Sequence, residues 1–152
     1  MCDKLQILII DDSKTFVIKL KRVLEQSHSN VVQISTCDNP KQAIRDVRGI
    51  RFDIVFVDDV FQESNMNGRD ILHAAPTTFL THYILISGRK LIVRVNPLCS
   101  DILSLQMLSK RDINKLFIYK LISAIVQKKK NAHIKSRMIK ELQLWTSRKE
   151  DV

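Results

Sequence analysis

Short apolar runs and amphipathic segments alternate along most of the chain. Leu5 to Ile10 is a run rich in β-branched residues that stops abruptly at Asp11, as expected of a strand buried on both faces. From Lys14 onward the apolar residues recur at helical spacing with charged residues between them. This pattern predicts a helix that is capped by Asp12 or Ser13. The chain therefore begins with a buried strand followed by a helix.

The same alternation is repeated several times. Further strands are predicted at 31–35, 52–57, 83–86 and, from a weaker pattern, 102–108, and helices at 40–47, 70–75 and from 112 onward. The segment 89–100 is ambiguous, because its apolar run suits a strand as well as a helix and Asn96-Pro97 interrupts it. Strands that alternate with helices predict an α/β fold, in which helices cover both faces of a parallel sheet.

Polar side chains stand where the predicted strands end. They are Asp11 and Asp12 after the first strand, Asp58 and Asp59 after the third, Ser87 after the fourth and Lys110 after the fifth. Each has a simple alternative explanation, as a helix cap, a solvated turn or a surface lysine. Parallel sheets bind ligands at the carboxyl ends of their strands, so we expect these side chains to converge on one site.

The motifs at these strand ends resemble the receiver domain of two-component response regulators, over about residues 4–127. They are Ile-Leu-Ile-Ile-Asp11-Asp12-Ser13, Phe52-Asp53-Ile-Val-Phe-Val-Asp58, Asn67-Gly68-Arg69-Asp70-Ile71-Leu72, Tyr83-Ile-Leu-Ile-Ser87-Gly88 and Leu108-Ser109-Lys110. The resemblance implies a three-layer, doubly wound α/β fold of the flavodoxin-like type, whose five parallel strands lie in the order 2-1-3-4-5.

The resemblance also assigns the phosphoryl chemistry. It implies that Asp58 is the nucleophile that accepts the phosphoryl group, and that Lys110 and Ser87 contact the phosphoryl oxygens. Positive groups around those oxygens stabilise the transition state of the transfer. Asp59 is the alternative acceptor, but the spacing from Asp53 and the buried run before Asp58 favour Asp58.

A magnesium site is implied by the same motifs. The expected ligands are Asp11, Asp12, Asp58 and the backbone carbonyl of Val60, with Asp12 binding directly and Asp11 through water. Mg²⁺ prefers hard oxygen ligands and usually keeps several waters, so a small group of carboxylates suits it. A divalent ion would keep clustered carboxylates ionised, and so keep Asp58 nucleophilic.

Three features depart from the family pattern. The loop from Asp59 to Gly68 is slightly longer than usual and lacks a Met-Pro element. Arg111 stands where a proline normally follows the lysine, so no cis peptide bond is expected there. Met107 stands where the family usually has a Tyr or Phe that rotates on activation. Tyr83 and Tyr119 are the residues that could take that role. These departures keep open a second interpretation, a pseudo-receiver that binds partners without efficient phosphorylation.

The carboxyl-terminal segment, residues 128–152, is predicted to be an extended basic amphipathic helix that follows the receiver domain expected at 1–127. Its apolar residues at near-helical spacing are Ile134, Met138, Leu142 and Trp145, and Lys and Arg residues lie among them. The stripe could pack on the receiver or form a homodimer, the basic face could bind nucleic acid or anionic membrane, or the charges could only keep the helix in solution. Packing or dimerisation is favoured at this point.

Composition limits the remaining classes of function. The 152 residues are 45% hydrophobic, which excludes a disordered chain, and three widely spaced cysteines indicate neither a disulfide framework nor a zinc site. No apolar run is long enough to be a transmembrane segment and no signal-peptide pattern is present, so a cytoplasmic protein is expected. We expect a signalling domain that receives phosphate from a sensor histidine kinase or phosphotransfer protein, and not a metabolic enzyme. The net charge of +9 leaves a small nucleic-acid-binding protein as a third possibility.

Overall fold

The computed structural model of the chain describes residues 4–76, 81–88 and 105–150. Its strands are β1 (Leu5–Ile10), β2 (Val32–Cys37), β3 (Ile54–Asp58), β4 (His82–Ser87) and β5 (Leu105–Ser109). Its helices are α1 (Lys14–His28), α2 (Pro40–Gly49), α3 (Gly68–Ala74) and α4 (Lys115–Glu150). The ambiguous segment 89–100 and the first residues of the strand predicted at 102–108 lie outside the described residues.

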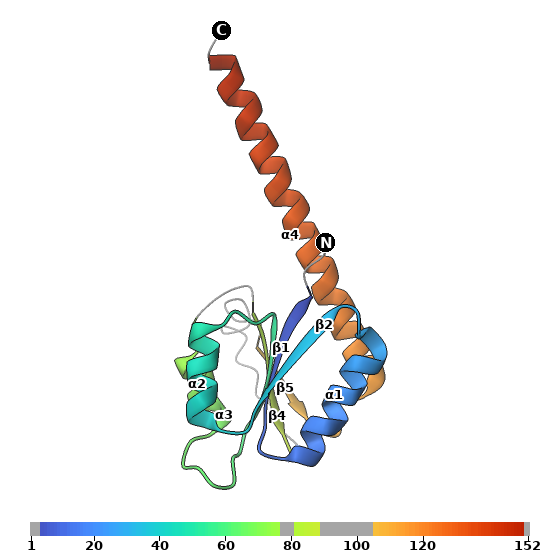
Figure 1. Cartoon of the computed structure of the whole chain (residues 1–152), viewed down its shortest axis with the longest axis vertical. Coiled ribbons are helices and arrows are strands. Elements are labelled where there is room, and N and C mark those ends of the chain that lie inside the picture. Colours follow the sequence, from blue (N-terminus) through green and yellow to red (C-terminus); the bar gives the residue numbers. More distant parts are fainter. Residues whose placement is uncertain (1–3, 77–80, 89–104, 151–152) are drawn as a thin grey trace. The chain divides into compact units, whose positions relative to one another are not determined.

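The five strands form one parallel sheet in the order β2-β1-β3-β4-β5 (Figure 1). The register pairs Ile10 of β1 with Cys37 on one side and with Val57 on the other. Asp58 of β3 is paired with Ile86 of β4. The predicted fold class and strand order are therefore confirmed, and the carboxyl ends of the strands meet at one edge of the sheet.

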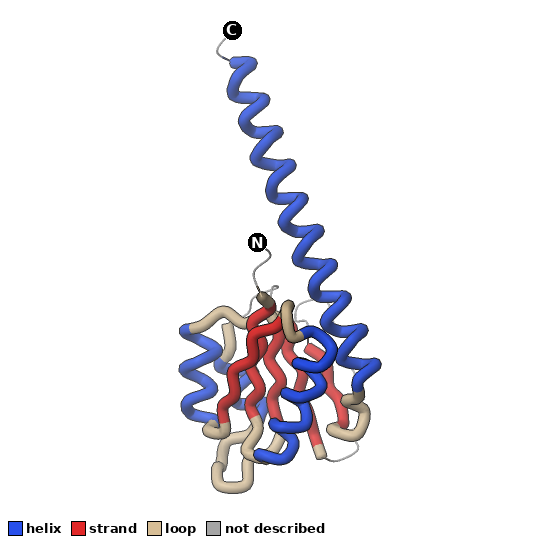
Figure 2. The backbone as a smooth tube through the Cα atoms, turned by 45° about the vertical axis from the view of Figure 1, so that its right-hand side comes forward, coloured by secondary structure: helices blue, strands red, loops and turns tan. Residues whose placement is uncertain are grey.

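Helices cover both faces of the sheet, α1 on one side and α2 with α3 on the other (Figure 1). The central strands lie side by side between these layers, as Figure 2 shows. In β1, Leu8 and Ile10 join the apolar cluster that also contains Ala43 and Val47 of α2. Ile7 and Ile9, which alternate with them, are buried as well. Burial on both faces explains why this strand is an uninterrupted apolar run.

The observed boundaries differ from the predicted ones by a few residues, for local reasons. Helix α3 begins at Gly68 instead of residue 70 because Asn67 caps it. The side chain of Asn67 accepts a hydrogen bond from the amide of Asp70, and that of Asp70 accepts one from the amide of Asn67. This reciprocal arrangement satisfies donors that a helix start leaves without partners. For α1, the structure selects Ser13 as the cap.

The chain divides into two units, residues 1–118 and 119–152. The first contains the sheet and α1 to α3, and the second consists of the remainder of α4. This helix runs without a break through residue 127, where the sequence pattern placed a boundary. Among the described residues, no helix combines the length and apolarity needed to span a membrane.

Candidate functional site

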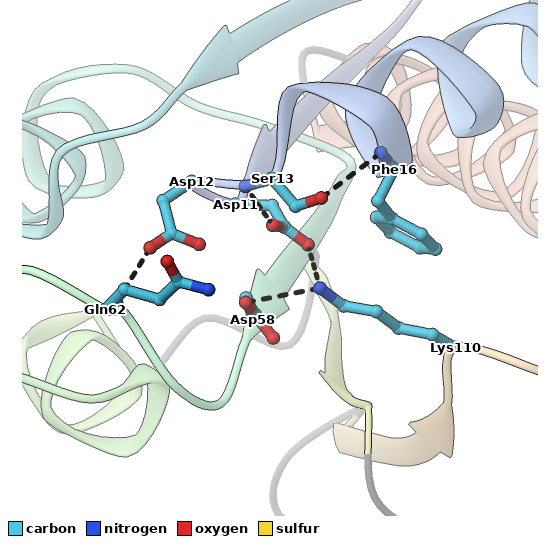
Figure 3. Close-up of polar contacts among 7 residues, drawn as sticks. All are labelled: Asp11, Asp12, Ser13, Phe16, Asp58, Gln62 and Lys110. Carbon is cyan, nitrogen blue, oxygen red and sulfur yellow. Dashed lines mark hydrogen bonds and ion pairs between the residues drawn. The ribbon is translucent and has the colours of Figure 1, made fainter.

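The candidate site lies at the carboxyl edge of the sheet, where three strands bring acidic and basic side chains together (Figure 3). Asp11 and Asp12 directly follow β1, and Asp58 is the last residue of the neighbouring strand β3. Lys110 follows β5 and donates its backbone amide to the carbonyl of Ser87 at 2.8 Å. Residues far apart in the sequence therefore meet, as the pattern of strand ends predicted.

Lys110 forms ion pairs with two of the carboxylates. Its Nζ lies 2.7 Å from Oδ2 of Asp11 and 3.3 Å from Oδ2 of Asp58. The Asp11 side chain is almost completely buried and that of Asp58 is 8% exposed. Since buried charges are costly unless they are paired, this ammonium compensates part of the negative charge at the site.

The electrostatics of the cluster leave Asp58 with a strongly perturbed acidity. Burial, followed by the negative charge of Asp11, raises the pKa of Asp58 from 3.8 to about 6, and Lys110 offsets this only in part. For Lys110, burial alone would lower the pKa, but the two carboxylates outweigh it and the pKa is raised. Lys110 is therefore a stable cation. Its single positive charge does not balance the negative charges of the three carboxylates in the cluster.

Phe16, one of the apolar residues that recur at helical spacing after Lys14, also lies at this site. The Nζ of Lys110 lies 4.7 Å from the centroid of the Phe16 ring, a cation–π distance. Phe16 stands in the first turn of α1, whose cap Ser13 accepts a hydrogen bond from the Phe16 amide at 3.4 Å. The turn after β1 therefore places both an acid and an aromatic ring around the same ammonium.

Backbone amides fix the orientation of the two acids that follow β1. The amide of Ser13 donates to Oδ1 of Asp11 at 2.7 Å. The amide of Gln62, in the loop after β3, donates to Oδ2 of Asp12 at 2.8 Å. Each carboxylate oxygen still has lone pairs available, because one oxygen can accept two bonds. These hydrogen bonds therefore fix both carboxylates and leave lone pairs on their oxygens for a further ligand.

Three carboxylates are arranged so that a metal ion fits between them. Asp11, Asp12 and Asp58 each offer an oxygen, and these oxygens lie within 4.8 Å of one another. An all-oxygen, mostly buried donor set is the kind that Mg²⁺ prefers. The raised pKa of Asp58, caused partly by Asp11, indicates the same need for a further cation. The residues present therefore fit a divalent ion.

The other predicted site residues lie near the cluster, and their roles stay predictions. Ser87 is buried at the end of β4, one residue after the partner of Asp58 in the register. Val60 is exposed and forms an isolated antiparallel bridge with Asn67 across the loop. Asp59 is paired with Arg69, its Oδ1 lying 3.7 Å from Nε, and is less buried than Asp58. These positions make Asp58 the better candidate acceptor.

The three residues considered for the aromatic that rotates on activation differ in their exposure to solvent. Tyr83 is buried in the apolar core and Met107 packs against the same cluster. Tyr119 is exposed. The described residues contain no cis peptide bond, in agreement with the expectation for Arg111.

A pocket gives solvent access to the acidic cluster on the side of Asp12. It has a volume of about 710 Å³ and lies between the start of α2 and the loop after β3. Its lining includes Asp12, Asn39, Lys41 and Gln62. A hydrated cation can therefore reach Asp12 from this side.

Comparison with known proteins gives a consistent result at the level of the fold. No protein-family model matches the sequence, and no curated protein matches it. Among solved structures, a CheY-like receiver domain from Methanospirillum hungatei has a TM-score of 0.64 at 14% identity, covering 85% of this chain and 99% of its own. A two-component response regulator from Clostridium difficile has a TM-score of 0.60 at 22% identity, covering 82% and 97%.

A third match reaches further along the chain. It is a fusion protein that contains residues 181–211 of the yeast Spc42 trimeric coiled coil, with a TM-score of 0.65 at 15% identity and 97% of each chain covered. The other matches are consistently response-regulator receivers, so the predicted receiver fold is confirmed.

Proposed function

We propose that this chain is a phosphoacceptor receiver, which takes a phosphoryl group from a sensor histidine kinase or a phosphotransfer protein onto Asp58. The observation that carries the proposal is the contact of one ammonium, Lys110 Nζ, with Asp58 at 3.3 Å and Asp11 at 2.7 Å. A helix cap, a solvated turn and a surface lysine would not require these groups to meet. The receiver fold supports the same conclusion, because its function depends on an acidic edge of this kind.

The transfer is a nucleophilic displacement at phosphorus. A carboxylate oxygen of Asp58 forms a bond to phosphorus while the bond from phosphorus to the donor's imidazole nitrogen breaks. The electron pair of that bond leaves with the imidazole, which takes a proton from solvent. Asp58 must be ionised to react, and its pKa of about 6 leaves it mostly ionised at neutral pH.

Lys110 and Ser87 act on the transferred group. The ammonium of Lys110 already lies beside Asp58, where it neutralises charge that develops on the phosphoryl oxygens. The Ser87 hydroxyl donates a hydrogen bond to the phosphorylated state from the adjacent strand end. A phosphoryl group brings about two negative charges and forms one to three new charge-assisted hydrogen bonds, enough to shift a two-state loop.

Asp11, Asp12 and Asp58 would hold Mg²⁺, with the carbonyl of Val60 as a further ligand. The ion would supply positive charge to the acidic cluster and to the oxygens of the phosphoryl group. Asp11 and Asp12 are preorganised for this by the amides of Ser13 and Gln62. The domain is a cytoplasmic signalling element that promotes its own phosphorylation and dephosphorylation, and not a metabolic enzyme.

The proposal is tested by incubating the protein with acetyl phosphate and Mg²⁺ and measuring its mass. We expect a gain of one phosphoryl group, abolished by Asp58→Asn and by chelation of the metal. Asp59→Asn is the matched control, because it removes the neighbouring carboxylate and should retain the gain. If the unaltered protein gains no mass, the pseudo-receiver that binds partners without phosphorylation becomes the better interpretation.

A further inference from the structure

The second half of α4 exposes an apolar stripe. Ile134, Met138 and Leu142 are spaced four residues apart and are 56%, 57% and 60% exposed. Ile139, 46% exposed, lies about 100° around the helix axis from Met138 and is not part of the stripe. Side chains at i, i+4 and i+8 lie along one face of a helix. This surface is the largest exposed group of bulky apolar side chains among the described residues.

The stripe does not continue the face by which α4 starts in the core. Ile118, near the start of the helix, is completely buried. Met138 follows it by 20 residues, which at about 100° per residue places it roughly 160° around the helix axis. The exposed stripe is therefore on a different face of α4 from the one that is buried at the start of the helix.

Basic side chains border this stripe on both sides. At about 100° per residue, Lys130 and Arg137 lie along one edge and Lys128 and Lys135 along the other. Residues 128–144 contain six Lys or Arg and one acidic residue, Glu141, which is paired with Arg137 at 3.0 Å. A partner must therefore accept apolar side chains in its interior and offer negative charge around them.

A second copy of the chain does not meet this requirement. Two such helices would place their bordering cations next to one another, whereas the flanking positions of stable coiled coils carry opposite charges. Nucleic acid offers negative charge but takes up no aliphatic stripe. An anionic bilayer offers both, since apolar side chains enter the boundary of the acyl chains while Lys and Arg reach the headgroups.

We propose that residues 128–144 of α4 bind the surface of a membrane rich in anionic lipid, with Ile134, Met138 and Leu142 inserted and the bordering Lys and Arg residues on the headgroups. Binding is reversible and peripheral, because one short stripe buries little apolar area. It would localise the receiver at the membrane independently of phosphorylation, so it does not depend on the proposed function of Asp58.

The test uses the full chain and vesicles of two compositions, pure phosphatidylcholine and phosphatidylcholine mixed with phosphatidylglycerol. Trp145 is the single tryptophan and lies within α4, so its fluorescence reports binding, and cosedimentation gives the bound fraction. We expect binding to the anionic vesicles that weakens as salt is raised, and much weaker binding to pure phosphatidylcholine.

Three variants separate the apolar and the charged contributions. Lys130→Gln with Lys135→Gln should reduce partitioning by roughly tenfold or more. Ile134→Ser with Met138→Ser should reduce it by a similar factor, while helical circular dichroism is kept. Lys19→Gln with Arg22→Gln removes the same charge from exposed positions on α1 and should have no effect.

Four results would overturn the proposal. The first is no binding to the anionic vesicles. The second is binding that the Ile134 and Met138 substitutions leave unchanged, which would indicate charge attraction alone. The third is equal loss in the α1 control. The fourth is a dimer in sedimentation equilibrium that Met138→Glu dissociates, which would assign the stripe to a second copy of the chain.

Discussion

At the scale of single residues, the ammonium of Lys110 contacts three other side chains of the site. Lys110 contacts Asp11 and Asp58, and the ring of Phe16 lies 4.7 Å from it. Three side chains thus restrict where the ammonium can go, and all three approach it from the strands and the helix that surround the edge of the sheet. The result is a cation that already lies beside the proposed nucleophile, so little reorganisation is needed when a phosphoryl group arrives.

The raised pKa of Asp58 makes stability depend on pH in the metal-free protein. Between 3.8 and about 6 the folded state binds more protons than the unfolded state, so the free energy of unfolding falls as pH rises through this range. Asp58→Asn removes the cost of the buried charge, and at neutral pH we expect it to be more stable by as much as about 3 kcal/mol. Chemical denaturation of both proteins in chelator, at several pH values, measures the difference.

Mg²⁺ provides the control for this prediction. In the unaltered protein it should raise the unfolding midpoint at neutral pH, because binding to the folded state alone stabilises that state. In Asp58→Asn the increase should be much smaller. An equal increase of the unfolding midpoint in both proteins would mean that the ion binds at a site without Asp58.

Phe16 should influence phosphorylation through Lys110. Phe16→Leu keeps an apolar side chain but loses the cation–π contact, which contributes about 0.5–2 kcal/mol. We expect phosphorylation by acetyl phosphate to slow by roughly two- to tenfold, an effect measured as the initial rate of mass gain. Phe16→Tyr keeps an aromatic ring, so its rate of phosphorylation should be close to that of the unaltered protein. Equal rates in the Leu and Tyr variants would show that the ring has no role beyond packing.

The polar members of the site were predictable from sequence, but their aromatic neighbour was not. Asp11, Asp58 and Lys110 stand at abrupt ends of apolar runs, and parallel strands bring such ends together. Phe16 lies in an ordinary helical pattern, where an aromatic residue suggests packing. Its contact with Lys110 depends on two segments nearly a hundred residues apart, which no local pattern encodes.

At the scale of elements, the loop after β3 joins the site to helix α3. The amide of Gly68 donates to the carbonyl of Asp59 at 3.0 Å, and Asn67 bridges to Val60. Gly68 also lies against the backbone of Asp58, because a Cβ at this position would collide with the Asp58 carbonyl oxygen and lie 2.7 Å from Cδ1 of Leu85. The start of α3 is therefore in direct contact with the strand end that carries the proposed acceptor.

Gly68→Ala should therefore disturb both stability and the site. We expect a loss of about 1–3 kcal/mol, typical of overpacking, and slower phosphorylation because the Asp58 backbone must move. Gly49→Ala is the matched control, since a Cβ there would meet nothing within 4 Å. Thermal unfolding of both variants, together with the rate of mass gain, gives the comparison. Similar behaviour of the two variants would contradict the close packing at Gly68.

Element type was easier to predict than element length. The first strand was predicted at its observed bounds, Leu5–Ile10, because its apolar run ends directly at Asp11. The second strand was predicted to stop at residue 35 but extends to Cys37. It is an edge strand whose Ser35 and Thr36 are exposed, so its apolar pattern is lost before the strand ends, while pairing with β1 continues to the buried Cys37.

At the scale of the whole molecule, the chain combines two units with different character. Residues 1–118 contain the acidic site and a core buried on both faces of the sheet, whereas residues 128–144 form an exposed basic helix. The sequence predicted both properties, since composition and periodicity change along the chain. The predicted extended basic helix at the C-terminus is therefore confirmed, although Lys115–Glu150 is one continuous helix with no break at the boundary that the sequence pattern placed after residue 127.

This division predicts that phosphorylation and the basic helix can be altered separately. Lys130→Gln with Lys135→Gln should leave the initial rate of phosphorylation by acetyl phosphate within about twofold of the unaltered protein, because exposed, screened charges outside the site contribute little. Acetyl phosphate is used in place of a kinase because a small phosphodonor does not need a protein docking surface on the chain. A large change in rate would show that α4 and the acidic site are coupled.

Locating the phosphorylated residue is the most direct test of the central claim. Protein treated with acetyl phosphate and Mg²⁺ is reduced with borohydride, which converts an acyl phosphate on aspartate into homoserine, and the modified peptide is sequenced by mass spectrometry. We predict homoserine at position 58 and unmodified aspartate at position 59. Homoserine at 59 or elsewhere, with Asp58 intact, would contradict the assignment of the acceptor and the role given to Lys110.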